Sequence, residues 1–204
     1  LHVSTEGSVA LVRAAKERGV RVTAEVTPHH LTLTDELVDG YDPVMKVNPP
    51  LRTAEDVAAL REGLLDGTID AIATDHAPHG HERKQQPWEH APHGMVGLET
   101  AFAVVHTALV VEGRLAPLAL IERMTAGPAR VRDLGGHGGP IAAGAPANLA
   151  VLDPAVRWSP SVGDLAGRSR NSPYLGRELV GRARHTVLRG RFSLRDGRVL
   201  GPVA

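Results

Sequence analysis

The chain has 204 residues, of which 42% are hydrophobic and 23% are charged, a composition typical of a folded globular protein. The 23 Lys and Arg residues balance the 23 Asp and Glu residues, so no overall charge would attract nucleic acid or an acidic membrane surface. The chain has no cysteine, which excludes a disulfide framework, a thiolate metal site and a cysteine nucleophile, and which agrees with a cytoplasmic location.

The chain opens on Leu1-His2-Val3, a pattern that indicates the end of a buried strand. Because Leu1 is not an initiator methionine, we expect further residues upstream of it. Ser4 or Thr5 is expected to cap a helix that ends at Gly19. Residues 20–26, rich in β-branched side chains, are expected to form a strand.

A second strand and helix pattern follows a longer irregular stretch. Thr53 with Asp56 resembles a capping box for a helix that ends at Gly67. Residues 69–74 are the next apolar run, and Asp75 stands at its C-terminal end. These features predict a helix followed by another short buried strand.

The segment 80–94 is polar and rich in proline and histidine, so it is expected to be a loop long enough to carry function. Its Pro and Gly residues suit a hinged lid that closes over a ligand. Apolar spacing then predicts helices over residues 98–113 and 118–125.

Strands followed by helices predict an α/β fold with a parallel sheet and helical crossovers. Three such units cannot close a barrel, and we expect them to be the C-terminal portion of a (β/α)8 TIM-type barrel, about strands six to eight. The polar residues that stand out all follow strands, which is where such a barrel carries its chemistry.

The glycine-rich run at 135–139 indicates a boundary, so we expect a partial barrel over residues 1–138 and a small β-rich segment over residues 139–204. Short antiparallel strands are predicted in that segment at 149–152, 186–188 and 192–194. The pairs Arg189-Gly190 and Asp196-Gly197 are the turn residues between them.

Asp75-His76-Ala77-Pro78-His79 is the densest group of chemically competent side chains. A carboxylate at a strand end, flanked by imidazoles, can bind a divalent metal and take a proton from water. An equally plausible alternative is that Asp75 caps the next turn while the histidines hydrogen-bond locally. His2, at the end of another strand, would face the same rim and is a second candidate ligand.

Adjacent residues of an extended chain point to opposite sides, so His29 and His30 cannot both easily reach one metal. We expect one of them to be structural and neither to be a ligand. Asn48 precedes two prolines that fix the backbone, which suits either an amide presented to a polar ligand or a solvent loop.

The glycines in 94–100 would let backbone N–H groups approach a ligand at a helix start, although this pattern alone is weak. His90 and His93 are equally compatible with ordinary surface positions.

Taken together, these motifs resemble class I dihydroorotase, a member of the amidohydrolase superfamily. The segment 171–174 and residues 139–153 resemble the C-terminal β segment of the same enzymes, so the resemblance covers essentially the whole chain. The motifs that carry it, in the order and approximate spacing of that family, are His2-Val3-Ser4-Thr5, Glu25-Val26-Thr27-Pro28-His29-His30-Leu31, Lys46-Val47-Asn48-Pro49-Pro50-Leu51-Arg52, Thr74-Asp75-His76-Ala77-Pro78-His79 and Gly97-Leu98-Glu99-Thr100.

The resemblance implies a two-zinc enzyme that reversibly cyclises N-carbamoyl-L-aspartate to L-dihydroorotate in pyrimidine biosynthesis. His2 matches a zinc ligand at the end of the sixth barrel strand. Asp75 matches a ligand at the end of the eighth strand, which also acts as general base and later as general acid.

The substrate contacts are carried over in the same way. Asn48 and His79 match residues that hold the dihydropyrimidine ring, and His93 and Gly94 match a loop position whose backbone contacts substrate. His29 and His30 match a family signature that is not assigned to the metals.

The sequence departs from the family in several places. The first-strand His-x-His pair, the bridging carboxylate and the fifth-strand histidine are absent, so this chain alone is expected to be incomplete and inactive. Asn148 stands where the family often has Asp, and His93 stands where an aromatic residue is common.

Two alternatives remain open: a hydantoinase or allantoinase, and a non-catalytic scaffold partner of aspartate transcarbamoylase. For the enzyme, a homodimer or an association with that same transcarbamoylase is compatible with the resemblance.

Overall fold

The helices of the chain follow the capping residues that the sequence supplies. The structure, a computed structural model, describes residues 1–201. Its α-helices are α1 (Glu6–Glu17), α2 (Ala54–Leu65), α3 (His81–Lys84), α4 (Ala101–Val105), α5 (Pro117–Met124) and α6 (Ala126–Val131), and its shorter helical turns are η1 (Asp35–Val38), η2 (Pro43–Met45), η3 (His106–Val111) and η4 (Val162–Asp164).

The predicted caps of α1 and α2 are confirmed. Thr5 Oγ1 accepts a hydrogen bond from the backbone N–H of Ser8, and Thr53 Oγ1 accepts one from Asp56. Helix α1 ends at a glycine, as predicted, because Gly19 has a φ of 77° and its N–H bonds to the carbonyl of Lys16. A residue in this left-handed conformation satisfies carbonyls that the helix end leaves free.

The parallel sheet is shorter than predicted. Strands β1 (Glu25–Val26) and β2 (Ala71–Ile72) pair in parallel, with Glu25 opposite Ala71 and Val26 opposite Ile72. The predicted strands 20–26 and 69–74 were therefore too long, because apolar, β-branched residues form strand only where a partner strand lies in register. The segment after Leu1 does lie beside β1, since the N–H of Val3 donates to the carbonyl of Glu25 over 2.9 Å.

The predicted helix over 98–113 is divided into α4 and the π-helical turn η3. The hydroxyl of Thr107 donates to the carbonyl of Ala103 over 2.6 Å and accepts from the N–H of Val180. A hydroxyl that takes the carbonyl four residues back competes with the helical ladder, which accounts for the wider turn. The helix α6 was not predicted, and it contains Gly127 and Pro128, two residue types that disfavour a helix interior. A proline is tolerated in the first turn, where its missing N–H has no partner to lose.

The C-terminal part forms a four-stranded antiparallel sheet in the order β3-β4-β5-β6. Its strands are β3 (Leu149–Trp158), β4 (Leu179–Leu188), β5 (Arg191–Arg195) and β6 (Arg198–Val199), which contain the three predicted strands. The turn pairs Arg189-Gly190 and Asp196-Gly197 all have positive φ, as a two-residue hairpin turn requires. The boundary near residue 138 remains a prediction.

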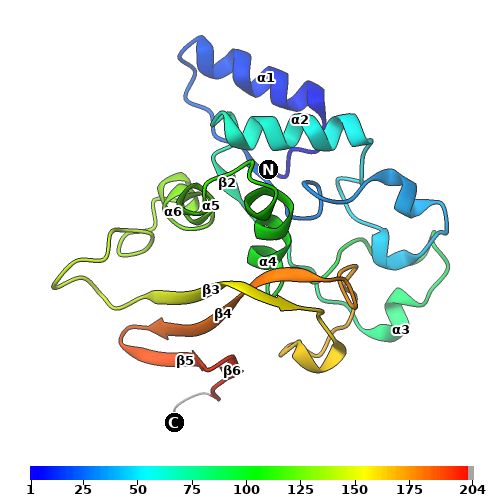
Figure 1. Ribbon diagram of the computed structural model, residues 1–204. Coiled ribbons are helices and arrows are strands. Elements are labelled where there is room, and N and C mark those ends of the chain that lie inside the picture. Colours follow the sequence, from blue (N-terminus) through cyan, green and yellow to red (C-terminus); the bar gives the residue numbers. More distant parts are fainter. Residues whose placement is uncertain (202–204) are drawn as a thin grey trace.

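Two buried clusters hold these elements together. The first lies among α1, α2, the parallel strands and α5; its buried members are Val9, Val26, Leu31, Leu60, Leu64, Ile69, Ile72, Val105, Leu109, Leu115 and Leu120. The second lies under the irregular segments and β4; its buried members are Leu33, Val47, Leu51, Met95, Ala103, Val104, Tyr174 and Leu179. Figure 1 shows α1 and α2 at one end, the antiparallel sheet at the other, and α4 and α5 between them.

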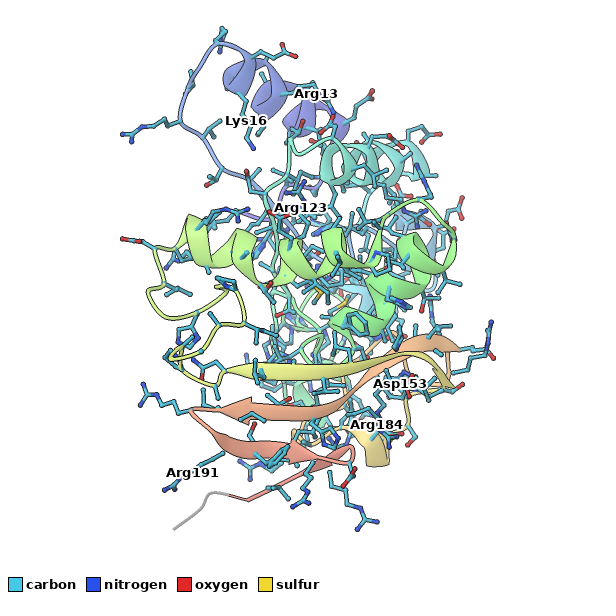
Figure 2. All side chains as sticks on the ribbon, turned by 60° about the vertical axis from the view of Figure 1, so that its left-hand side comes forward. Arg13, Lys16, Arg123, Asp153, Arg184 and Arg191 are labelled. Atoms are coloured by element: carbon cyan, nitrogen blue, oxygen red, sulfur yellow. The ribbon has the colours of Figure 1, made fainter. Side chains whose placement is uncertain are left out.

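The same layering is visible in Figure 2, where Arg13 and Lys16 mark α1 and Asp153 and Arg184 mark the sheet. Helix α4 packs directly on β4. Gly181 permits this approach, because a Cβ there would lie 2.8 Å from Phe102 Cε1. Within residues 1–201, no helix is long and apolar enough to cross a membrane.

The close approach of α6 to β2 yields a stability prediction. A Cβ on Gly127 would lie 2.5 Å from the backbone carbonyl oxygen of Asp70, so Gly127→Ala must displace backbone. We expect it to lower the free energy of unfolding by about 1–3 kcal/mol in chemical denaturation. Gly135→Ala is the matched control, since nothing lies within 4 Å of its Cβ position. Equal stability of the two variants would contradict this account of the packing.

Candidate active site

His2 and Asp75 lie together at the edge where the parallel strands end. His2 Nε2 is 3.6 Å from Asp75 Oδ1, and the two side chains keep 23% and 31% of their surface exposed. Both residues have positive φ, 49° for His2 and 47° for Asp75. Such a backbone is uncommon for residues other than glycine and gathers at functional sites. The geometry therefore brings together the two predicted metal ligands.

Glu25 of β1 lies behind His2. Its Oε1 is 3.0 Å from Nδ1 of His2, on the opposite side of the ring from Asp75. The N–H of this nitrogen is not directed along the contact, so Nδ1 has no well-aligned hydrogen-bond acceptor. A carboxylate on the far nitrogen of a histidine is the usual support of a metal-binding imidazole. Glu25 was not singled out from the sequence.

The pair fits part of a zinc site. Two ligands of a tetrahedral zinc ion, each about 2.1 Å from the metal, lie roughly 3.4 Å apart, close to the observed separation. Among residues 1–201, however, no group of three His, Cys, Asp or Glu side chains is placed to share one metal ion. The described part of the chain therefore offers two ligands, and a full coordination shell needs others.

His30 is structural, as expected for one of the adjacent histidines. Its Nε2 lies 3.0 Å from the carbonyl oxygen of Pro49, and its Nδ1 lies 2.7 Å from Thr27 Oγ1. Because a carbonyl only accepts, Nε2 carries the proton and Nδ1 accepts from the threonine hydroxyl. Burial lowers the pKa of His30, which keeps the ring neutral. The ring thereby ties the end of β1 to the segment that carries Asn48.

The side chain of His29 makes fewer hydrogen bonds than that of its neighbour His30. It is 2% exposed, its ring centroid is 4.5 Å from that of His30, and its Nε2 has no hydrogen-bond partner within residues 1–201. Burial, followed by the charges of His30 and His2, lowers the pKa of His29 to about 3. His29 is therefore a neutral buried base beside the candidate site.

Asn48 lies at the surface next to a cis peptide bond to Pro49. The carbonyl of Lys46, two residues earlier, accepts a hydrogen bond from the N–H of Gly94 over 2.8 Å. Two of the predicted substrate-contacting segments are thus joined through their backbones. That Asn48 contacts a substrate remains a prediction.

His76 hydrogen-bonds locally, which was the alternative to metal binding for the histidines of this group. Its Nδ1 accepts hydrogen bonds from the N–H groups of Gly97 and Leu98, each over 3.2 Å. The N–H groups expected to approach a ligand are therefore occupied by a side chain of the same protein. Nδ1 of His76 therefore acts as an acceptor in this arrangement.

His79 and His93 are joined directly. Nε2 of His79 lies 2.8 Å from the carbonyl oxygen of His93, so that this nitrogen is the donor. The N–H of His79 donates to Oδ1 of Asn171, whose Nδ2 donates to the carbonyls of Ala77 and Gly94. Asn171 is 4% exposed and uses both ends of its amide. Its role was missed, although the polar run at 171–174 had been noticed.

A wide surface cavity of about 780 Å³ adjoins this group. Its lining includes His79, Asn171, Lys84, Arg170 and Trp88. Neither His2 nor Asp75 lines it, so the cavity adjoins the candidate substrate contacts and not the ligand pair. The lining also includes the Asp42 carboxylate, so charged groups of both signs line the cavity.

Asn148, a departure from the related sequences, has a structural role. Its Oδ1 accepts from the N–H of Arg189 over 2.9 Å, and its Nδ2 lies 3.4 Å from the carbonyl of Gly136. An aspartate could make only the first of these contacts. The hydrogen bonds of the Asn148 side chain go to Gly136 and Arg189 and not to His2 or Asp75.

The chain belongs to the amidohydrolase family, whose model matches residues 2–191. It is similar to the dihydroorotase of Streptomyces coelicolor, with 58% identity over 198 residues that are 97% of this chain and 46% of that protein. It is also similar to the dihydroorotase of Leifsonia xyli subsp. xyli, with 55% identity over 99% of this chain and 46% of that protein. The resemblance to dihydroorotase is therefore confirmed, and the chain spans less than half the length of these relatives.

Solved structures give the same architecture. L-hydantoinase from Arthrobacter aurescens is 32% identical with a TM-score of 0.90, over 98% of this chain and 45% of that one. D-hydantoinase from Thermus sp. is 27% identical with a TM-score of 0.90, over the same shares. The α/β fold is thus shared with enzymes whose names denote cyclic-amide substrates.

The buried His29 yields a pH prediction. Because its pKa is lowered when folded, the unfolded state binds more protons, and stability falls as the pH drops from 6.5 toward 3. Between pH 6.5 and 3, we expect the free energy of unfolding of His29→Phe to fall by on the order of 2–5 kcal/mol less than that of the unmodified chain. The measurement is denaturation of the metal-free protein. His90→Phe, at an exposed position, is the control. An unchanged pH dependence in His29→Phe would refute this assignment.

Proposed function

We propose that this chain provides part of the active site of a zinc-dependent dihydroorotase. The enzyme interconverts N-carbamoyl-L-aspartate and L-dihydroorotate, a step of pyrimidine biosynthesis. The observation that carries the proposal is the approach of His2 Nε2 to 3.6 Å from Asp75 Oδ1 in a chain 58% identical to a dihydroorotase. Since the chain spans 46% of that relative, the activity is proposed for an enzyme that includes the remaining ligands.

We further propose that the parallel strands belong to a (β/α)8 barrel. The segment ending at His2 corresponds to its sixth strand, β1 to its seventh and β2 to its eighth. The parallel pairing of β1 with β2 and the bond from Val3 to Glu25 support this order. A TM-score of 0.90 to hydantoinases over 98% of the chain supports the shared architecture.

In the proposed reaction, His2 and Asp75 would hold part of the zinc site, and the metal would supply Lewis-acid polarisation of the scissile amide carbonyl. Asp75 takes a proton from the attacking water and delivers it to the ring nitrogen as the C–N bond breaks. In the direction of ring closure, the same carboxylate takes the proton from the carbamoyl nitrogen. Glu25, whose Oε1 lies 3.0 Å from His2 Nδ1, would accept a hydrogen bond from that nitrogen when Nε2 binds the metal.

The substrate is oriented by the second group of residues. Asn48 offers an exposed amide with both donors and acceptors, which suits the alternating N–H and C=O groups of a dihydropyrimidine. His79 adds a ring whose Nε2 is fixed on His93, so that its Nδ1 is left as the acceptor. The backbone of His93 and Gly94 completes this wall of the site.

Two alternative functions are open, and one of them has a specific observation in its favour. A hydantoinase or allantoinase is favoured by the hydantoinase structures, at 27–32% identity, but the curated dihydroorotases are 55–58% identical. A scaffold that binds aspartate transcarbamoylase would have no need of the His2 and Asp75 pair. For the enzyme, a homodimer, an association with that transcarbamoylase and a cytoplasmic location remain predictions.

The roles of the ligand pair are testable in a chimera in which this chain replaces the matched segment of the Streptomyces coelicolor dihydroorotase. We expect Asp75→Asn to lower kcat by about 10²–10⁴-fold, because the proton carrier is lost. His2→Asn is expected to lower the zinc-to-protein ratio measured by mass spectrometry. Asp39→Asn, at an exposed position, is the control and should change neither quantity. An active, zinc-replete Asp75→Asn chimera would exclude the proposed chemistry.

Turnover of three candidate substrates by the same chimera distinguishes the dihydroorotase from its alternatives. We expect kcat/KM for N-carbamoyl-L-aspartate to exceed that for hydantoin and for allantoin by at least about tenfold. Asn48→Ala is expected to raise KM for N-carbamoyl-L-aspartate by about 5–100-fold, the cost of one buried polar contact. Preferential turnover of hydantoin or allantoin would replace the dihydroorotase proposal with that alternative. No turnover of any of the three would favour the scaffold.

A further inference from the structure

Three successive carbonyls of the loop 80–94 are turned inward onto side chains. Pro92 O accepts from Lys84 Nζ over 3.0 Å, His93 O accepts from His79 Nε2 over 2.8 Å, and Gly94 O accepts from Lys84 Nζ over 3.0 Å. The last residues of the loop are thus held by hydrogen bonds from side chains and not by a strand or helix. Their conformation depends on those donors.

Lys84, the last residue of α3, is unusual within the segment 80–94 that had been expected to be a loop. It is 6% exposed, whereas Arg83 before it and Gln85 after it are exposed. Burial is the largest cause that lowers the pKa of Lys84 to about 8; the positive charge of Lys46 lowers it further, and Asp42 opposes the shift. Among residues 1–201, the hydrogen bonds of Lys84 Nζ go to the carbonyls of Pro92 and Gly94 and not to a carboxylate.

The hydrogen bonds of Lys84 do not depend on its charge. A neutral amine has two N–H groups, which is the number that Pro92 and Gly94 require. Burial of the amine therefore leaves both carbonyls satisfied whether or not the third proton is present. This explains how a lysine is accommodated without a carboxylate partner.

The bonds converge on Gly94. Its carbonyl also accepts from Asn171 Nδ2 over 3.1 Å, and its N–H donates to Lys46 O over 2.8 Å. Its φ is 120°, and a Cβ there would lie 2.4 Å from the Cβ of Ala77. The Gly94 peptide is therefore fixed from three directions between the segments that carry Asn48 and His79.

We propose that Lys84 is a positioning residue whose two hydrogen bonds fix residues 92–94 against His79 and so shape the wall of the substrate site. The hydrogen-bonded arrangement stands on the geometry of this chain alone. The effect on substrate binding rests on the proposed function.

The arrangement is tested by amide exchange of Gly94, measured by NMR on the 204-residue chain. We expect Lys84→Met to accelerate this exchange by about tenfold or more, because the bond from Gly94 to Lys46 is no longer held in place. Arg83→Met, the neighbouring exposed cation, should leave the exchange unchanged. Unchanged exchange in a folded Lys84→Met variant would overturn the proposal.

If Lys84→Met fails to fold, chemical rescue of a second variant tests the same hydrogen bonds. Because the chain has no cysteine, Lys84→Cys introduces a single thiol. Alkylation with 2-bromoethylamine restores an amine of nearly the length of lysine, whereas 2-bromoethanol adds a hydroxyl with one donor. We expect the aminoethyl adduct to restore slow exchange of Gly94 and the hydroxyethyl adduct to restore it incompletely. Equal behaviour of the two adducts would contradict a requirement for two N–H donors.

The functional consequence is measured in the chimera. Lys84→Met is expected to raise KM for N-carbamoyl-L-aspartate by about tenfold and to change kcat by less than about twofold. A larger loss of kcat than of substrate binding would exclude a positioning role. An inactive chimera with Lys84 intact would count against the proposed function alone, because the amide-exchange experiment is independent of activity.

Discussion

The parallel register of β1 and β2 is the constraint on which the candidate site depends. Glu25 lies opposite Ala71 and Val26 opposite Ile72, and the N–H of Val3 bonds to Glu25. Parallel neighbours end at the same edge, so three segments distant in sequence deliver their next residues to one place. A shift of one residue in this register would carry Asp75 away from His2 and reverse the faces of the strands.

The irregular segments around that edge are ordered mainly by side chains that donate to backbone carbonyls. His30 holds Pro49, His79 holds His93, and Lys84 with Asn171 holds Gly94. Each bond satisfies a backbone group that ordinary secondary structure leaves without a partner. Polar residues therefore have two tasks here, since some face the space where ligands would bind and others build the wall behind them.

Much of the architecture follows from local sequence. Thr5 and Thr53 cap helices, Gly19 ends one, and the Arg189-Gly190 pair turns a hairpin, because each effect operates within a few residues. Strand lengths do not follow in this way, since residues 20–24 have the composition of a strand but lack a partner in register. The division between α4 and η3 likewise depends on contact with Val180, more than 70 residues away.

In the candidate site, too, some residues are recognisable from the sequence and others only from the fold. His2 and Asp75 stand out because they follow apolar runs, and the structure places them together. The supporting residues Glu25, Lys84 and Asn171 are ordinary polar residues in the sequence, and their roles appear only when distant segments are adjacent. The functions of Asn48 and His79 depend on a ligand and so remain predictions.

The proposed function requires that His2 and Asp75 are both ligands of the zinc site. Anomalous diffraction at the zinc edge, from crystals of the zinc-loaded chimera, tests it most directly. We expect a zinc peak within about 2.0–2.2 Å of His2 Nε2 and a zinc peak within the same distance of an oxygen of Asp75, whether one ion or two account for them. Zinc bound elsewhere, or bound to only one of these two residues, would contradict it.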